Sequence, residues 1–193
     1  FIALFGMALN ISALDIPEIF GNDMILQRNT QCKIWGWAEA NHYVRIVTGW
    51  DNHCYQVKAG SDGAWKVEVK TPEASYNTYD ITFTEYKSDP EKKAKGNQPI
   101  ATSVSKDVLI GEVWFCSGQS NMEMPLGGFW NCPVEGANET ILESKKYNRS
   151  IRVATIAKDG KQEPQKKVAG KWEKAEPKNA SRFSACAYYF ATT

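Results

Sequence analysis

Histidine is scarce in this chain. The 193 residues include two, His42 and His53, and no histidine follows the second one. An excess of charge of one sign is also missing, because the formal net charge is +1. The composition therefore gives no electrostatic reason to expect nucleic acid or an anionic membrane as a partner. No apolar run approaches the roughly 20 residues that a membrane-spanning helix needs.

Cysteine is sparse, and its spacing has no metal-binding pattern. The five cysteines form no Cys-x-x-Cys or similar ligand set, so we expect no metal site. Cys32 and Cys54 could pair if their strands are neighbours, but free thiols are expected in a chain of this length. Cys116 lies in an apolar run and is expected to be a small buried hydrophobic residue.

The first 13 residues predict the tail of a secretory signal peptide. Phe1–Leu9 is apolar and is followed by the small pair Ser12-Ala13. The alternative is a first apolar strand or helix of the fold. We favour the signal remnant because the strand pattern restarts at Leu14, and this choice implies a secreted or periplasmic protein.

Residues 14–107 have the pattern of an all-β domain. Alternating segments are separated at short intervals by turn signals such as Gly21-Asn22-Asp23 and Ser61-Asp62-Gly63. Several strands at this spacing predict a β-sandwich. The expected strands are Glu18–Phe20, Met24–Gln27, Gln31–Trp37, Tyr43–Thr48, His53–Ala59, Ala64–Lys70 and Asp80–Glu85.

Residues 108–193 have a different, mixed pattern. The run Val108–Phe115 is rich in β-branched and aromatic residues and predicts a buried strand. Further expected elements are a helix within Glu135–Tyr147, a strand at Ile151–Ile156, a lysine-rich loop at Lys158–Lys171, and a helix at Ser181–Phe190 with Ser181 as its N-cap. The predicted fold class is therefore mixed: an all-β sandwich followed by the beginning of an α/β domain.

Small and polar residues end the apolar run at Cys116–Asn121. Gly118 permits a sharp turn and a close backbone approach. Ser120 then lies just past the carboxyl end of the expected strand, where open α/β sheets place their ligands. A serine there can present its hydroxyl to a substrate, while its own N–H faces a developing oxyanion. The turn is not the common G-x-S-x-G elbow, because position 122 is Met.

The longer string Gly111–Leu126, GEVWFCSGQSNMEMPL, closely resembles the first block of the sialate O-acetylesterase family. These proteins are serine esterases of the SGNH hydrolase superfamily, which has a flavodoxin-like α/β domain. Asn22–Arg28, Trp35–Ala38 and Asp62–Val67 resemble the family's N-terminal β-sandwich module in order and spacing. The resemblance implies that Ser120 is the nucleophile and that its backbone N–H is an oxyanion donor.

The same resemblance implies residues that this sequence lacks. The family's catalytic His and its Asp partner come from a downstream Asp-x-x-His motif, and no such motif follows Ser120. We do not assign His42 or His53 as the base, because both precede Ser120 and fall in the expected sandwich. We therefore expect a truncated chain with little or no esterase activity by itself.

The leading functional hypothesis is a carbohydrate esterase that removes O-acetyl groups from sialic acid or a related acetylated glycan. It requires no metal or organic cofactor. Gln119 and Asn121, which flank the nucleophile, are expected to contact substrate. The alternative is a non-catalytic module. Trp35 and Trp37 fall on one face of a strand and could hold a sugar, although core packing and domain contact are the simpler explanation.

Overall fold

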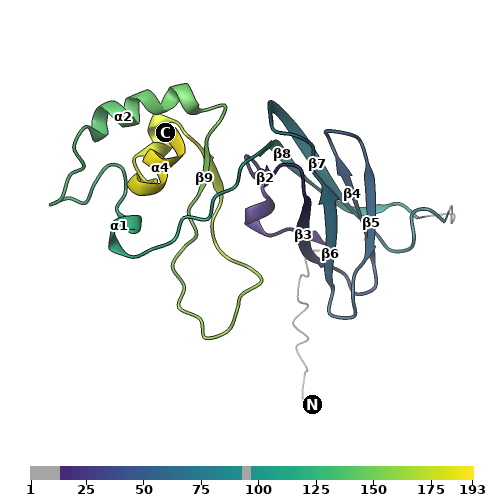
Figure 1. The fold of residues 1–193 in the computed structure, drawn as a ribbon. Helices are drawn as coiled ribbons and strands as arrows, with labels where there is room; N and C mark the ends of the chain where they lie inside the picture. Colours follow the sequence, from purple (N-terminus) through teal and green to yellow (C-terminus); the bar gives the residue numbers. More distant parts are fainter. Residues whose placement is uncertain (1–13, 93–96) are drawn as a thin grey trace, which may run out of the picture.

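Two β-sheets fill the first part of the chain, and short helices dominate the second (Figure 1). The computed structural model describes residues 14–92 and 97–193. The expected signal remnant at residues 1–13 lies outside the described residues. No helix in the described part of the chain is long and apolar enough to cross a membrane.

The smaller sheet has three antiparallel strands in the order β1-β3-β6. The larger sheet has five strands in the order β2-β8-β7-β4-β5 and is mixed, because β2 runs parallel to β8. The strand bounds are β1 Leu14–Asp15, β2 Ile25–Gln27, β3 Gln31–Ala38, β4 Tyr43–Thr48, β5 Cys54–Lys58, β6 Ala64–Lys70, β7 Ser75–Tyr86 and β8 Pro99–Gly111.

Both sheets contribute to one hydrophobic core. Every second side chain of a strand points to the same face, and the buried faces carry the apolar residues. Ile34 of β3 and Val69 of β6 are fully buried, as are Ile46 of β4 and Phe83 of β7. The alternating patterns are those of strands with one buried face, and β4 and β6 have the expected bounds.

The expected strand Glu18–Phe20 is wrong, because these residues form the 3-10 helix η1. Pro17 precedes it and lacks a backbone N–H. The Phe20 N–H donates to the Pro17 carbonyl at 2.8 Å, and the Gly21 N–H donates to the Glu18 carbonyl at 2.9 Å. The segment therefore satisfies its backbone locally instead of pairing with a strand.

The expected buried strand Val108–Phe115 is wrong in its second half. β8 passes through the expected domain boundary at residues 107 and 108 and ends at Gly111. Val108 and Ile110 are buried in the core of the first part, whereas Phe115 is 91% exposed. The chain leaves the sheet at Glu112, which pairs with Arg28 on the neighbouring connection. The division of the chain into domains remains a prediction.

The second part has its own small core. Its elements are α1 Ser120–Glu123, α2 Ala137–Glu143, the 3-10 helix η2 Ser144–Tyr147, β9 Arg152–Ala154, β10 Trp172–Lys174, α3 Pro177–Ala180 and α4 Ala185–Thr192. Leu126, Phe183 and Tyr188 are buried together between these helices. The strand expected at Ile151–Ile156 is present in shortened form as β9, and its partner β10 is antiparallel.

Helix α4 begins later than the sequence predicted. Its N-cap is Ser184, whose hydroxyl accepts from the Ala187 N–H at 3.3 Å, and not Ser181. Pro177 starts the separate short helix α3, because proline is well suited to the first turn of a helix. Ser181 is the C-cap of that helix. The predicted N-cap, Ser181, therefore lies three residues before the observed N-cap, Ser184.

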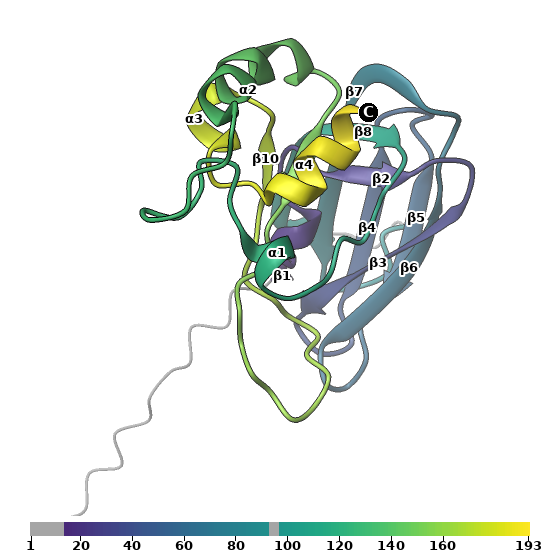
Figure 2. The ribbon, with the colours of Figure 1, turned by 60° about the vertical axis from the view of Figure 1, so that its left-hand side comes forward.

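The lysine-rich loop between β9 and β10 lies against the first part of the chain (Figure 2). The Trp35 indole N–H donates to the Lys166 carbonyl at 3.1 Å. The Lys167 ammonium lies 4.6 Å from the centre of the Trp37 ring and also pairs with Asp15. Both tryptophans therefore contact this loop, which favours domain contact over a sugar-binding platform.

Candidate active site

Ser120 is exposed and begins helix α1, directly after an extended segment that leaves β8. The backbone N–H groups in the first turn of a helix have no acceptor within the helix. The Ser120 N–H is one of these groups, so it is available to an external oxyanion. Within residues 14–92 and 97–193, no group hydrogen bonds to the Ser120 hydroxyl.

Gly118 makes the turn before Ser120 possible. A Cβ atom at position 118 would lie 2.9 Å from the Met122 Cβ, closer than real Cβ atoms approach one another. A larger residue would push the extended segment away from helix α1. Glycine is therefore required at position 118 for steric reasons, and the close backbone approach predicted from the sequence is observed.

Helix α1 is fixed to the start of helix α4. The Ala185 N–H donates to the Met124 carbonyl at 2.9 Å, and the Leu126 N–H donates to the Phe183 carbonyl at 2.7 Å. Leu126 is completely buried in the second core. The segment after the serine thus anchors the turn through one buried side chain and a short backbone ladder.

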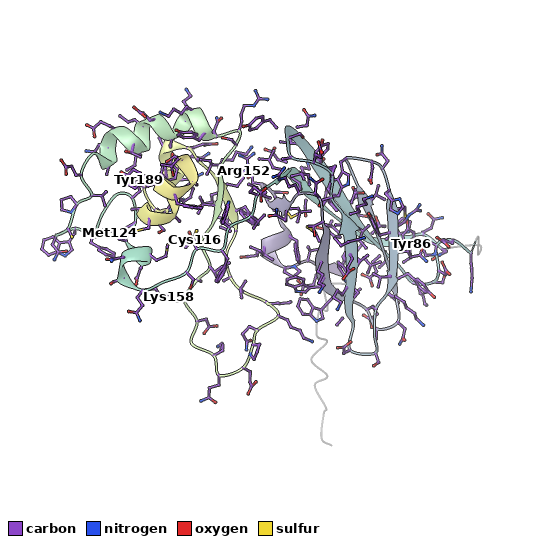
Figure 3. The ribbon with its side chains drawn as sticks, in the orientation of Figure 1. Tyr86, Cys116, Met124, Arg152, Lys158 and Tyr189 are labelled. Carbon is purple, nitrogen blue, oxygen red and sulfur yellow. The ribbon has the colours of Figure 1, made fainter. Side chains whose placement is uncertain are left out.

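A cavity of about 730 Å³ adjoins this turn. Its lining includes the extended segment 112–119, residues 150–156 and Lys158 at the beginning of the β9–β10 loop. Gln119, Met122 and Glu123 line the cavity, while Ser120 itself is not one of the wall residues. Figure 3 labels Cys116, Arg152 and Lys158, three residues of the wall that come from separate segments.

The charged side chains of this wall are paired. Lys158 forms an ion pair with Glu123, which lies three residues after Ser120 in helix α1. Arg182 contacts Glu173 at 2.9 Å. Across the described residues, no group of three or more His, Cys, Asp or Glu side chains could hold a metal ion.

A partly buried charge cluster joins β8 to β9 and β10, and Arg152 of this cluster also lines the cavity. Asp107 pairs with Lys174 of β10 and lies 3.7 Å from Arg152 of β9, whose side chain is 2% exposed. Burial alone would raise the pKa of the Asp107 carboxyl, but the hydrogen bond from Lys174 and the two positive charges lower it below the ordinary value. The same hydrogen bond raises the pKa of the Lys174 ammonium.

Both histidines belong to the first part of the chain, as expected. The His42 Nδ1 atom lies 2.7 Å from Oε1 of the buried Glu85. His53 packs edge-on against Tyr55 with ring centres 4.5 Å apart. Each histidine lies immediately before a strand of the larger sheet, and its printed contacts are with residues of that sheet rather than with helix α1.

Three predictions about residues near the turn have different outcomes. Cys116 is exposed, so its expected burial is wrong: among the described residues, no strand pairs with the segment after Gly111 and covers it. Gln119 lines the cavity, and the Asn121 carbonyl accepts from the Cys186 thiol at 3.3 Å. Substrate contact by Gln119 and Asn121 remains a prediction. All five cysteines are free, and Cys32 and Cys54 lie in different sheets.

Sequence reasoning missed the pairing of Lys158 with Glu123. Lys158 was assigned to a surface loop, although it follows the β-branched run Ile151–Ile156 by two residues. This position could have indicated that Lys158 lies near the site, because residues just after the carboxyl end of a strand lie at the ligand-binding edge of an α/β fold. The partner, 35 positions earlier in the chain, could not be identified from local pattern.

Known proteins similar to this chain share one enzymatic description. The human sialate O-acetylesterase is 26% identical over 163 residues, which is 82% of this chain and 29% of the relative. The rat sialate O-acetylesterase is 27% identical over 141 residues, or 70% of this chain and 23% of the relative. The chain therefore spans less than a third of the length of these relatives.

The fold is also similar to that of a solved acetylesterase structure. A carbohydrate acetylesterase from Xanthomonas citri matches with a TM-score of 0.76 and 26% identity, over 93% of this chain and 36% of that one. No protein-family profile matches the chain. The sequence and structure relatives agree: the chain is similar to sialate O-acetylesterases and to a carbohydrate acetylesterase, and it matches these longer proteins over a portion of their length.

Proposed function

We propose that this chain carries the nucleophile of a carbohydrate acetylesterase, and that Ser120 is that nucleophile. The observation that carries the proposal is the position of Ser120: an exposed serine at the first turn of a helix, beside a cavity of about 730 Å³. The names of the relatives, all acetylesterases, support the same chemistry.

In the proposed reaction the Ser120 hydroxyl oxygen attacks the carbonyl carbon of an acetyl ester on a sugar. A base removes the hydroxyl proton, and the oxyanion of the tetrahedral intermediate accepts a hydrogen bond from the Ser120 N–H. The intermediate expels the sugar oxygen, which takes up a proton, and leaves acetyl-Ser120. Water then releases acetate and restores the serine.

Among the described residues, no histidine lies near Ser120 that could act as the catalytic base. We propose that a histidine with a carboxylate partner, from polypeptide other than these residues, completes the site. The extended segment 112–118 supports this view: it has no strand partner in the described structure, and Trp114 and Phe115 are exposed. Such a segment is suited to become a sheet strand of an SGNH-type α/β domain that follows the β-sandwich.

The substrate in this proposal is an O-acetylated sialic acid or a related acetylated glycan, encountered outside the cytoplasm. A purely glycan-binding module is a weaker second candidate, because the loop that contains Lys166 and Lys167 contacts the two tryptophans it would use.

The test is turnover of 4-nitrophenyl acetate by the whole protein and by the chain of 193 residues alone. For the whole protein, Ser120→Ala is expected to lower kcat by at least about 1000-fold. The control Ser117→Ala removes a neighbouring exposed hydroxyl in the same turn and is expected to retain activity. The chain alone is expected to show little turnover. Equal rates for Ser120→Ala and the unmodified protein would refute the assignment.

A further inference from the structure

Trp130 is the most exposed large apolar side chain in the part of the chain that the structure describes, at 97%. Phe129 beside it is 42% exposed. Both residues lie in the segment that connects α1 to α2. This segment projects from the second part of the chain, on the side away from the first part (Figure 1 and Figure 2). The indole ring is therefore presented to solvent at the end of a projecting turn.

The turn that presents Trp130 is tightly built. The Phe129 N–H donates to the Cys132 carbonyl at 3.1 Å, and the Cys132 N–H donates to the Phe129 carbonyl at 3.0 Å. These two bonds close a hairpin turn with Trp130 and Asn131 at its tip. Gly128 precedes the hairpin with a φ of 74°, and a Cβ atom there would lie 2.7 Å from the Cys132 carbonyl oxygen. The sequence therefore specifies this turn, because only glycine fits the position without strain.

The base of the same turn is attached to the elements that hold helix α1. The Gly127 N–H donates to the Ser181 carbonyl at 2.9 Å, and the Leu126 N–H donates to the Phe183 carbonyl at 2.7 Å. Leu126 is completely buried. Helix α1, which begins at Ser120, and the hairpin turn are therefore supported by one connection, the chain between α3 and α4. The ring at the tip thus keeps a defined position relative to Ser120.

The hairpin turn differs in kind from the unpaired segment 112–118. A segment that lacks a strand partner exposes backbone groups as well as side chains. The turn instead makes its anchoring hydrogen bonds within itself and with residues 181–183, and the Gly128 N–H donates to the Pro125 carbonyl at 2.8 Å. It therefore presents side chains rather than a strand edge, and the indole is free to contact a ligand.

The two residues at the tip have the chemistry that recognises a sugar. One face of an indole is a flat apolar surface that fits the C–H face of a sugar ring. The exposed amide of Asn131 can donate to and accept from sugar hydroxyl groups. Tryptophan has only two side-chain torsions to restrict, so it provides this contact at a low cost in conformational entropy. Residues 124–134 contain no charged side chain, which argues against a partner held by charge.

We propose that Trp130 is a specificity-determining residue that stacks on a sugar ring of the glycan beyond the ring that carries the acetyl ester. The contact rests on the proposed function, in which Ser120 attacks that ester. It predicts that the protein hydrolyses acetylated chains more efficiently than single acetylated sugars, because only a chain extends from the serine to the tip of the turn.

The experiment measures acetate release by the whole protein from matched pairs of a single acetylated sugar and a longer chain. One pair is O-acetylated methyl xyloside with O-acetylated xylotetraose, and the other is 9-O-acetyl-N-acetylneuraminic acid with the corresponding sialyllactose. For the pair that is hydrolysed, kcat/KM is expected to be higher for the longer member. Trp130→Ala is expected to lower the ratio of the two values about tenfold, an amount that burial of one indole face can supply. The change is expected in KM, because the ring touches no reacting atom.

Two further variants control for a purely structural effect. Trp130→Phe keeps an aromatic face and is expected to retain part of the preference for the longer member. Leu142→Ala removes another exposed apolar side chain, 70% exposed on α2, and is expected to leave the ratio unchanged. An equal fall on both members of a pair in Trp130→Ala would show that other polypeptide packs on the ring, and it would overturn the inference. An unchanged ratio, or an equal change in the control, would do the same.

Dependence on Ser120 is measured separately with Ser120→Ala. Full turnover in that variant would refute the proposed nucleophile, whereas the ratio would still report on Trp130. A ratio that ignores Trp130→Ala while turnover requires Ser120 would refute the glycan contact alone. Absence of turnover on both pairs, with hydrolysis of 4-nitrophenyl acetate that still requires Ser120, would also overturn the contact.

Discussion

Replacing Asp107 by Asn should loosen the connection between the two parts of the chain. Asp107 lies in β8, and its carboxylate contacts Lys174 of β10 and Arg152 of β9. Breaking a fully buried ion pair costs roughly 3–5 kcal/mol. Asp107 and Lys174 are each 30% exposed, and Lys174 keeps Asp23 at 3.2 Å. We therefore expect a loss of about 2 kcal/mol, mostly from the buried Arg152.

Asp107→Asn removes the negative charge and keeps the size and shape of the side chain. Asp107 has a φ of 59°, and asparagine tolerates this left-handed region better than most residues. Urea unfolding, followed by tryptophan fluorescence, measures the effect. Trp172 is a suitable probe because its indole N–H donates to the Ile19 carbonyl across the same boundary. With a slope of about 2 kcal/mol per molar urea, the midpoint should fall by about 1 M.

The control is Asp159→Asn, which breaks a pair with Lys161 whose side chains are 63% and 51% exposed. Such a pair contributes at most about 1 kcal/mol and often nothing measurable. Equal midpoints for Asp107→Asn, Asp159→Asn and the unmodified chain would show that the cluster does not hold the two parts together.

The Asp107 carboxyl also predicts that the free energy of unfolding falls as the pH is lowered below about 4. The pKa of Asp107 lies below its ordinary value of 3.8 in the folded chain. The unfolded chain therefore binds more protons in this range, so the stabilisation is present above about pH 4 and is lost as the pH falls through the folded pKa. The difference in unfolding free energy between the unmodified chain and Asp107→Asn should shrink below pH 4. A difference that stays constant down to pH 2 would contradict this account.

Two further substitutions test the packing of strand β3. Trp35→Phe keeps an aromatic ring but removes the N–H that donates to the Lys166 carbonyl, so we expect a loss of about 1 kcal/mol in urea unfolding and no change in glycan affinity. Gly36→Ala would place a Cβ 2.5 Å from the Asp15 carbonyl oxygen and 2.6 Å from the Trp65 ring, which should cost about 2–3 kcal/mol. The control Gly160→Ala has no atom within 4 Å of the new Cβ and should be neutral or slightly stabilising.

Local alternation was a reliable guide where a strand has one buried face. β4 and β6 have the predicted bounds because their residues alternate between core and solvent. The pattern failed in the run Val108–Phe115, which is apolar throughout. A continuous apolar run indicates that its residues are buried, but it does not indicate which hydrophobic core they join. Residues up to Ile110 join the core of the first part, and the rest leave that sheet at Glu112.

The cavity could not be predicted for a related reason. Its walls come from segments whose contacts are long-range in sequence, such as Glu123 with Lys158 and Trp114 with Phe190. No local signal connects these residues. The turn at Ser120 could be predicted because its requirements are local: a glycine that lets the chain approach Met122, and a leucine six residues after the serine that anchors the segment.

The proposed nucleophile Ser120 and the base that it requires would therefore differ in how a sequence reveals them. A nucleophile on a tight turn needs its immediate neighbours, so Gly118, Ser120 and Leu126 occur together in one short string. A base needs only to arrive within hydrogen-bond reach from any element, so its sequence position is free. The described structure follows this division: the turn is formed and held against α4, while the hydroxyl of Ser120 has no proton acceptor among the described residues. A turn held by backbone hydrogen bonds, with a serine hydroxyl that has no partner among the described residues, fits the proposal of a nucleophile whose base comes from another segment.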